Sequence, residues 1–340
     1  MNSSNNTLQK LVPPSASVND VNGILPPDEG FSYFDAYDQY PFLHSAKQFK
    51  KVNAWRLADC ALLAYAHEDF SKRQFEKFGL QKFRLFSGNS TQCHVASNDQ
   101  FSIVDFRGTE IKNSNLIQDL LIDVRANFSD SSLGGKVHDG FKAALDEIWY
   151  GEDGLLQYLQ QLKNEFQEMH FWYTGHSLGA ALAVLAAGRF KHVQGIYTYG
   201  CPKIGNSAFT SNFAPTNNFY RFVNNNDVIP ELPLTNLWVT SGTTNQLGVP
   251  IPWVDFHAPE LYQQVGSLMY IDQAGKSSEM PSSQAQLIDR FEGIVNNAKD
   301  SVVNLMSARL ANLPDSFVDH APVFYAVHTR NNFIDSLGAG

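Results

Sequence analysis

The sequence predicts an α/β fold: a mostly parallel central sheet with helices on both faces. Between residues 169 and 223, apolar strand patterns alternate with helix-length segments, and this order implies right-handed crossovers between parallel strands. The 340-residue chain is 43% hydrophobic and 17% charged, which is typical of a folded globular protein rather than a disordered chain. No internal repeat and no Pro/Gly-rich linker divides residues 45–340, so we expect them to form one domain.

The individual elements follow from hydrophobic periodicity and from the turn residues between them. Residues 1–44 carry two Pro-Pro pairs among Ser, Asn and Asp, which predicts an irregular N-terminal arm rather than a core element. An amphipathic helix is expected from about 46 to 67, and residues 276–312 are expected to form a mostly helical insertion. The other elements are strands at 82–86, 92–96, 101–106, 169–174, 193–199 and 219–223, and helices at 140–150, at 155–166 and from the turn at 179 to 190.

Charge and cysteine usage exclude several classes of partner. The net charge is −9, so the field of the protein repels phosphate backbones and we expect no nucleic-acid partner. The three cysteines, Cys60, Cys93 and Cys201, are widely spaced and lack zinc-ligand spacing, so the sequence predicts no disulfide framework, no metal and no cofactor.

The sequence also gives expectations about membranes and location. Residues 171–188 are long and uncharged enough to suggest a membrane span, but Gly, His and Ser in their middle indicate a buried strand, a tight turn and a helix. We therefore expect no transmembrane segment. The first residues have no basic region leading into an apolar stretch, which predicts a cytoplasmic protein, with peripheral attachment to membranes or lipid droplets as the alternative.

The segment Gly-His-Ser-Leu-Gly at 175–179 is the first candidate for chemistry. It has the form G-x-S-x-G and stands between an apolar strand and an alanine-rich helix, which is the context of a nucleophile elbow. Such a turn exposes the hydroxyl of Ser177, and small neighbours are needed because the turn is tight. The alternative is a small-residue turn that only packs the helix against the strand.

A serine nucleophile needs a base and an orienting acid, and in this kind of fold both follow it along the chain. Asp227 is the preferred acid because it follows the strand at 219–223 through an Asn-rich turn, at the carboxyl end where catalytic residues collect. Asp255 and Asp272 lack that placement. Asp227 as a turn-forming residue without catalytic function remains the alternative.

Three histidines are candidates for the base. His320 is preferred because its loop position, between a helical and an aromatic segment, can reach back over the sheet. His328 comes second, since its apolar surroundings favour a structural histidine, and His257 comes last in a Pro-rich excursion. The oxyanion formed during acyl transfer needs two backbone N–H donors. We expect them at Leu178 and at Thr109, although the turn at Thr109 is also compatible with an ordinary strand end.

These segments together resemble the class 3 lipases, the filamentous-fungal type of α/β-hydrolase. The similar segments occur in the family's order and span about residues 46–330. They are 106–109 (FRGT), 137–141 (VHDGF), 174–179 (TGHSLG), 199–206 (YGCPKIGN), 224–233 (NNNDVIPELP) and 319–325 (DHAPVFY). The resemblance implies an α/β-hydrolase fold with Ser177 as nucleophile, Asp227 as acid, His320 as base, and Thr109 with Leu178 in the oxyanion hole.

Two departures from the family pattern bear on function. Leu116 stands where the family usually carries the Trp of a W-x-x-D-L lid segment, and residues 110–115 are polar, so we expect weak or absent interfacial activation. Residues Asp227 and His320 are 93 positions apart, which is long for the fungal members and leaves room for an inserted element.

The resemblance and the candidate triad predict a serine carboxylic-ester hydrolase of the triacylglycerol lipase type, acting on acyl lipids through an acyl-enzyme. Its expected partner is an acyl-lipid or ester substrate at a lipid–water interface. One alternative is a polar-lipid acylhydrolase, either a phospholipase A1 or a galactolipase. Another is a lipase-like binding protein without turnover, and the intact Ser, Asp and His set argues against it.

Overall fold

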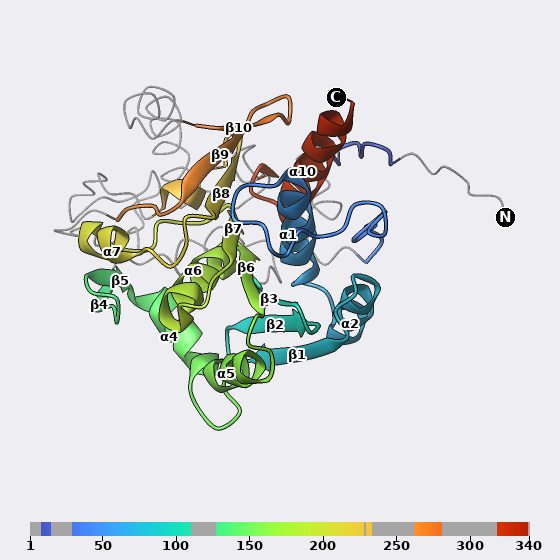
Figure 1. The fold of residues 1–340 in the computed structure, drawn as a ribbon. Helices are drawn as coiled ribbons and strands as arrows, with labels where there is room; N and C mark the ends of the chain where they lie inside the picture. Colours follow the sequence, from blue (N-terminus) through green and yellow to red (C-terminus); the bar gives the residue numbers. More distant parts are fainter. Residues whose placement is uncertain are drawn as a thin grey trace, which may run out of the picture.

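The computed structural model describes residues 8–14, 29–109, 127–227, 229–232, 262–280 and 318–338. Within these residues the centre of the molecule is an eight-stranded sheet with the order β1-β2-β3-β6-β7-β8-β9-β10 (Figure 1). The strands are β1 (Lys82–Ser87), β2 (Gln92–Ser97), β3 (Phe101–Phe106), β6 (His170–His176), β7 (Gly195–Tyr199), β8 (Phe219–Asn224), β9 (Ser267–Ile271) and β10 (Ser277–Glu279). A separate antiparallel pair consists of β4 (Phe128–Asp130) and β5 (Lys136–His138).

The central strands of the sheet are parallel and its edges are antiparallel. Strands β3, β6, β7, β8 and β9 pair in parallel, whereas β1, β2 and β10 add antiparallel strands at the two edges. Because the carboxyl ends of parallel strands share one edge, the residues after β3, β6, β7 and β8 come together there.

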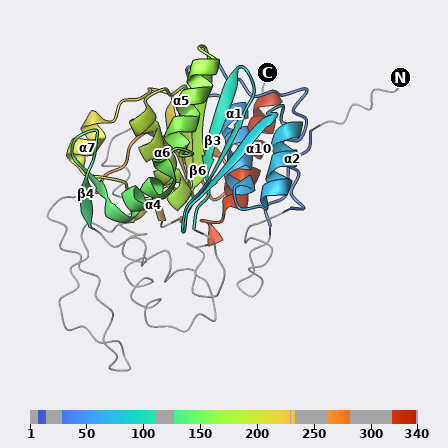
Figure 2. The same cartoon turned by 90° about the horizontal axis from the view of Figure 1, so that it is seen from below.

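Helices cover both faces of the sheet (Figure 2). One face carries α4 (Asp139–Trp149), α5 (Leu155–Glu165) and α6 (Leu178–Phe190), and the other carries α1 (Lys51–Leu63), α2 (Glu68–Lys77) and α10 (Pro322–Leu337). A short helix α7 (Ser207–Asn212) follows β7, and the 3₁₀ turn η2 (Ile229–Glu231) follows β8. This arrangement confirms the predicted α/β-hydrolase fold class.

The predicted amphipathic helix is shorter than expected and is not amphipathic. It runs over Lys51–Leu63, and nearly every residue in it is buried because the N-terminal segment and α10 cover the side that does not face the sheet. Even the charged residues are enclosed. Arg56 donates to Tyr40 O (2.9 Å) and stacks 3.7 Å from the Trp55 ring, and Asp59 accepts from Phe34 N (3.0 Å).

Two expectations about irregular regions need correction. The described part of the N-terminal arm forms turns and bends, but Tyr33, Phe34 and Phe42 are buried in the core, so residues 29–44 do not stand apart from it. In the expected helical insertion at 276–312, the residues Ser277–Glu279 form the edge strand β10 instead, and residues 281–317 lie outside the described residues.

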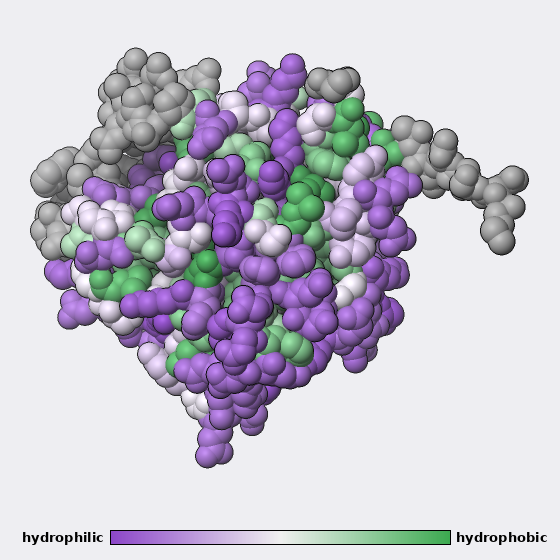
Figure 3. All heavy atoms as spheres, in the orientation of Figure 1, coloured by the Kyte–Doolittle hydropathy of each residue, from purple (hydrophilic) through white to green (hydrophobic). Residues whose placement is uncertain are grey.

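The surface seen in Figure 3 is mostly hydrophilic, with apolar residues scattered across it.

Candidate active site

Ser177 occupies a strained turn between β6 and α6. Its backbone has φ 58° and ψ −127°, a conformation that side-chain-bearing residues rarely adopt, and α6 begins at the next residue. The Ser177 N–H donates to Tyr199 O (3.0 Å), which ties the turn to the end of β7. A serine held in this way at the carboxyl edge of a parallel sheet has the geometry of a nucleophile elbow.

The two glycines of the elbow are required by close backbone contacts. A Cβ atom on Gly179 would lie 2.1 Å from Phe106 O, and one on Gly175 would lie 2.8 Å from the same oxygen. Both distances are too short for real carbon–oxygen contacts, so the spacing G-x-S-x-G has a steric cause. It also brings the elbow directly against the end of β3.

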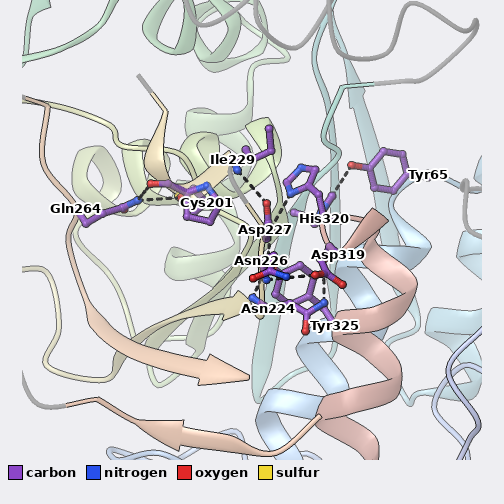
Figure 4. A network of polar contacts seen from close by, with 12 residues as sticks. Tyr65, Cys201, Asn224, Asn226, Asp227, Ile229, Gln264, Asp319, His320 and Tyr325 are labelled. Carbon is purple, nitrogen blue, oxygen red and sulfur yellow. Dashed lines mark hydrogen bonds and ion pairs between the residues drawn. The ribbon is translucent and has the colours of Figure 1, made fainter. Parts of the chain in front are cut away.

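Asp227 and His320 form a buried pair at the same edge of the sheet (Figure 4). His320 Nδ1 lies 2.8 Å from Asp227 Oδ2, and the Asp227 side chain is fully enclosed. Asp227 follows β8, and His320 lies in the turn that leads into α10. Because a carboxylate only accepts, Nδ1 carries the proton and Nε2 remains as the basic nitrogen.

The pair lies beside the elbow. The ring of His320 is 4.5 Å from that of His176, the residue before the serine, measured between centroids. A Cβ on Gly200, which follows Tyr199, would be 2.8 Å from His320 Nδ1 and 2.9 Å from Asp227 Oδ2. The Ser177 hydroxyl and His320 Nε2 are both buried and have no hydrogen-bond partner among the described residues. The structure therefore places Ser177 beside the buried pair of His320 and Asp227.

Further residues hold the carboxylate of Asp227. Ile229 N donates to Oδ1 (2.9 Å), and the Tyr325 hydroxyl donates to Oδ2 (2.5 Å) while it accepts from Asn224 N (3.1 Å). Burial and the neighbouring Asp227 charge raise the pKa of Tyr325 well above its ordinary value, so this hydroxyl stays protonated as a donor. The acid thus accepts three hydrogen bonds.

The turn that carries His320 is clamped to the acid loop by its neighbour Asp319. The Asp319 carboxylate accepts from Asn225 Nδ2 (3.0 Å) and Asn226 N (3.2 Å), and its carbonyl accepts from Asn224 Nδ2 (2.9 Å). Sequence reasoning did not assign these roles to Asp319 or to Tyr325. The spacing Asp-His-x₄-Tyr marked both residues, but their partners lie more than 90 positions away.

Gln264 braces the acid loop from the other side. Its Nε2 donates to Pro230 O (2.7 Å) and Cys201 O (3.0 Å), which joins the turn after β7 to the turn after β8. No pattern around Gln264 in the sequence indicated this role.

The candidate oxyanion donors lie on both sides of the elbow. Leu178 is the first residue of α6, and the first backbone N–H groups of a helix have no partner within the helix. Thr109 follows Gly108, on which a Cβ would lie 2.6 Å from His176 O, so the turn after β3 abuts the elbow. The Thr109 hydroxyl is buried and has no hydrogen-bond partner among the described residues.

The less preferred candidates lie elsewhere. His328 is on α10 and packs against Gly275, where burial lowers the pKa of its imidazole. Asp272 shapes a turn, because its Oδ1 accepts from Ala274 N and Lys276 N, both at 2.9 Å. His257, Asp255 and the lid segment 110–126 lie outside the described residues.

Three further observations concern the described residues. Cys60, Cys93 and Cys201 are buried and not joined in disulfides. No group of three or more His, Cys, Asp or Glu side chains there could hold a metal ion. None of the helices in the described part combines the length and hydrophobicity needed to cross a bilayer.

Comparison with known proteins places this geometry in a family context. Residues 103–237 match the sequence profile described as "Lipase (class 3)". The "Secreted mono- and diacylglycerol lipase A" of Penicillium cyclopium is 31% identical over 102 residues, which cover 26% of this chain and 33% of that protein. The "Lipase" of Rhizopus oryzae is 29% identical over 160 residues, which cover 41% of this chain and 39% of that protein. The chain thus spans less than half the length of these relatives.

Among solved structures, a lipase from Rhizopus microsporus var. chinensis aligns with a TM-score of 0.47 and 24% identity, covering 66% of this chain and 76% of that one. Several relatives, from Penicillium and Malassezia, are named as secreted lipases, which points to an extracellular location. The predicted cytoplasmic location, which rested on the N-terminal residues alone, is therefore wrong.

Proposed function

We propose that this chain, whose residues 103–237 match the class 3 lipase profile, hydrolyses carboxylic esters of acylglycerols with Ser177, His320 and Asp227 as its catalytic triad. The observation that carries the proposal is the 2.8 Å pair of His320 and Asp227 beside a serine held at positive φ. A nucleophile, a base and an orienting acid at one sheet edge are the parts that acyl transfer needs.

The geometry supports a two-step reaction. Ser177 Oγ attacks the ester carbonyl carbon while His320 Nε2 takes the hydroxyl proton, and the resulting oxyanion accepts hydrogen bonds from Leu178 N and Thr109. The tetrahedral intermediate then collapses to an acyl-enzyme, and His320 gives its proton to the leaving alcohol. Water, deprotonated by the same nitrogen, then attacks the acyl carbon. The bond from this carbon to Ser177 Oγ breaks, the carboxylic acid leaves, and His320 returns its proton to Ser177 Oγ.

Asp227 keeps the imidazole in the tautomer and orientation that this sequence of proton transfers requires. The Asp227 carboxylate is itself fixed by hydrogen bonds from Ile229 N and the Tyr325 hydroxyl, so the His320 ring is bonded to a carboxylate that keeps its position. In a site closed to water, fixed donors and acceptors of this kind contribute more than they do in solvent.

Acylglycerols are the proposed substrates because similar proteins are named as mono- and diacylglycerol lipases or as a triacylglycerol lipase. The polar-lipid acylhydrolase and the binding protein without turnover are not favoured. A binding protein would have no use for a strained serine aligned with a buried His–Asp pair.

The test is a hydrolysis assay on purified protein. A series of p-nitrophenyl esters of increasing acyl length is compared with emulsified triglyceride and with a galactolipid, using wild type, Ser177→Ala and Ser102→Ala. Ser102 is a matched control because its hydroxyl is also buried and without a partner among the described residues, at the amino end of β3.

We expect Ser177→Ala to lose about a million-fold in turnover and Ser102→Ala to keep the wild-type rate. Residual activity of Ser177→Ala above about one part in a thousand would contradict the proposal. A galactolipid turned over faster than triglyceride would contradict the assignment of the substrate class.

A further inference from the structure

We propose that Tyr65 is a positioning residue, which acts through His176 to hold the oxyanion turn at Gly108–Thr109 and the catalytic histidine in fixed relation to each other. The inference rests on the proposed function. Neither Tyr65 nor His176 touches the reacting atoms in the mechanism above, and their role follows from a chain of hydrogen bonds.

The Tyr65 hydroxyl sits between two parts of the site. It lies 2.9 Å from His176 Nδ1. It also packs against the Gly108 Cα so closely that a Cβ there would be 2.1 Å from the Tyr65 Oη. The ring extends from just beyond the end of α1 toward the active site (Figure 4).

The other end of the chain reaches the catalytic base. His176 Nε2 lies 2.6 Å from His320 O, and the two imidazole rings stand 4.5 Å apart between centroids. A carbonyl oxygen can only accept, so His176 Nε2 must carry a proton. His176 is thus bonded to the backbone of the base on one side and to Tyr65 on the other.

The direction of each hydrogen bond follows from the charge states. Burial lowers the pKa of His176 well below its ordinary value, so its ring is neutral and the only ring proton is on Nε2. Burial raises the pKa of Tyr65, so its hydroxyl keeps a proton and donates to His176 Nδ1. The hydrogen bonds therefore run from Tyr65 to His176 and from His176 to the His320 carbonyl, while the Tyr65 hydroxyl packs against Gly108.

These contacts link the oxyanion turn to the catalytic histidine, and the relative position of the two must be kept during acyl transfer. Thr109 directly follows Gly108, and His320 contributes the base. Preorganised donors stabilise an oxyanion only where they already stand in place, so a turn that can drift loses part of its effect. Without the Tyr65 hydroxyl, His176 Nδ1 loses its donor and Gly108 loses a close packing contact, so the transition state should be destabilised more than substrate binding.

The experiment compares Tyr65→Phe with Tyr197→Phe on a soluble short-chain p-nitrophenyl ester. Tyr197 is the matched control because its hydroxyl is also hydrogen-bonded, to Lys50 N (3.1 Å) and Asn218 Oδ1 (3.5 Å), at the opposite end of α1. We expect Tyr65→Phe to lower kcat by about tenfold to a hundredfold with KM nearly unchanged, below the loss for a missing oxyanion donor. Tyr197→Phe should keep the wild-type kcat.

Two further measurements separate positioning from a general loss of structure. The affinity for a trifluoromethyl ketone, which forms a tetrahedral adduct with the serine, should fall in Tyr65→Phe by the same factor as kcat/KM. The double variant Tyr65→Phe/His176→Asn should be no slower than the slower single variant, because both substitutions interrupt one chain.

Several outcomes would overturn the inference. A wild-type kcat in Tyr65→Phe, an equal fall in Tyr197→Phe, or additive losses in the double variant would each do so. In all three cases an active wild type and an inactive Ser177→Ala would leave the proposed function standing. A wild type that hydrolyses no ester would overturn the proposed function and this inference with it.

Discussion

The two faces of the central sheet bury different chemistry. Under α4, α5 and α6 the sheet packs against a large apolar cluster, to which α6 contributes a run of Ala, Leu and Val. Under α1 and α10 the buried residues include charged and titratable side chains. They are Arg56, Asp59, His94, Asp105 and Arg330.

This difference matches how each face contributes to the site. The apolar face positions Ser177 by steric fit, because α6 approaches β3 so closely that only glycine fits at position 179. The polar face positions His320 and Asp227 by hydrogen bonds: Tyr325 donates to Asp227, and Asn224 donates to the Tyr325 hydroxyl and to the carbonyl of Asp319, the residue before His320. Substitutions on the first face should therefore act through packing, and those on the second through polar contacts and protonation.

The largest loss of turnover is expected from a substitution on the polar face. His320→Ala should lower kcat by more than about ten-thousand-fold, because Ser177 then has no base, while the melting temperature should change little. His328→Ala, also on the α10 side but away from Asp227, should retain most of the turnover. Ester hydrolysis and thermal unfolding of both variants check this. A dead His328→Ala beside an active His320→Ala would reverse the assignment of the base.

The next largest effect, a loss of stability and activity, is expected from a substitution on the apolar face. Gly179→Ala should lower the free energy of unfolding by about 1–3 kcal/mol and reduce activity, since the new Cβ would meet the Phe106 backbone oxygen at 2.1 Å. Gly188→Ala in the same helix is the control, because its nearest neighbour is the end of the flexible Leu133 side chain at 2.7 Å. Urea titration measures both. Equal losses would show that steric fit at the elbow is not special.

A pair of tyrosines compares the two faces directly. Tyr325→Phe removes one of three donors to Asp227 and should lower kcat by about tenfold, which corresponds to about 1.4 kcal/mol in the barrier. Tyr173→Phe, on the apolar face, removes a buried hydroxyl that has no partner among the described residues, and should leave kcat unchanged. An unaffected Tyr325→Phe enzyme would mean that Asp227 is held without this hydroxyl.

A further expected effect is a dependence of stability on pH. Burial, with the nearby Arg107 charge, lowers the pKa of His94 from 6.5 to about 3. Below pH 6.5 the unfolded chain takes up a proton that the folded protein does not, so this group lowers stability as pH falls from 6.5 toward about 3. Its slope is at most about 1.4 kcal/mol per pH unit.

The variant His94→Gln isolates that contribution. The buried Asp105 has a pKa raised by burial and acts in the opposite sense, so the test is the difference between variant and wild type. In urea titrations from about pH 6.5 to 4, stability should fall less steeply for the variant. Parallel curves would show that His94 is not buried in its neutral form.

Local sequence patterns predicted the elements that build the elbow. The apolar strand, the G-x-S-x-G turn and the alanine-rich helix are adjacent in the chain, and the structure has them as β6, Ser177 at positive φ, and α6. Chain order and turn position also singled out Asp227 and His320, which the structure brings to 2.8 Å. These inferences needed little knowledge of distant contacts.

What could not be predicted depends on residues far apart in sequence. The burial of nearly all of α1 depends on α10, more than 250 positions later, so the pattern of α1 alone suggested an exposed face. Likewise, Tyr65 meets His176 across 111 positions and Tyr325 meets Asp227 across 98. The sequence patterns did not predict the polar helix α2 or the edge strand β10, because each contains few apolar residues.

The central claim is that Ser177 is the activated nucleophile of a triad with His320 and Asp227. Its most direct test is to treat the protein with a p-nitrophenyl alkylphosphonate ester and locate the adduct by mass spectrometry of the peptides. We predict one adduct per chain, on Ser177, formed slowly or not at all in His320→Ala. No adduct, or an adduct on another residue that forms equally fast in Ser177→Ala, would contradict the account.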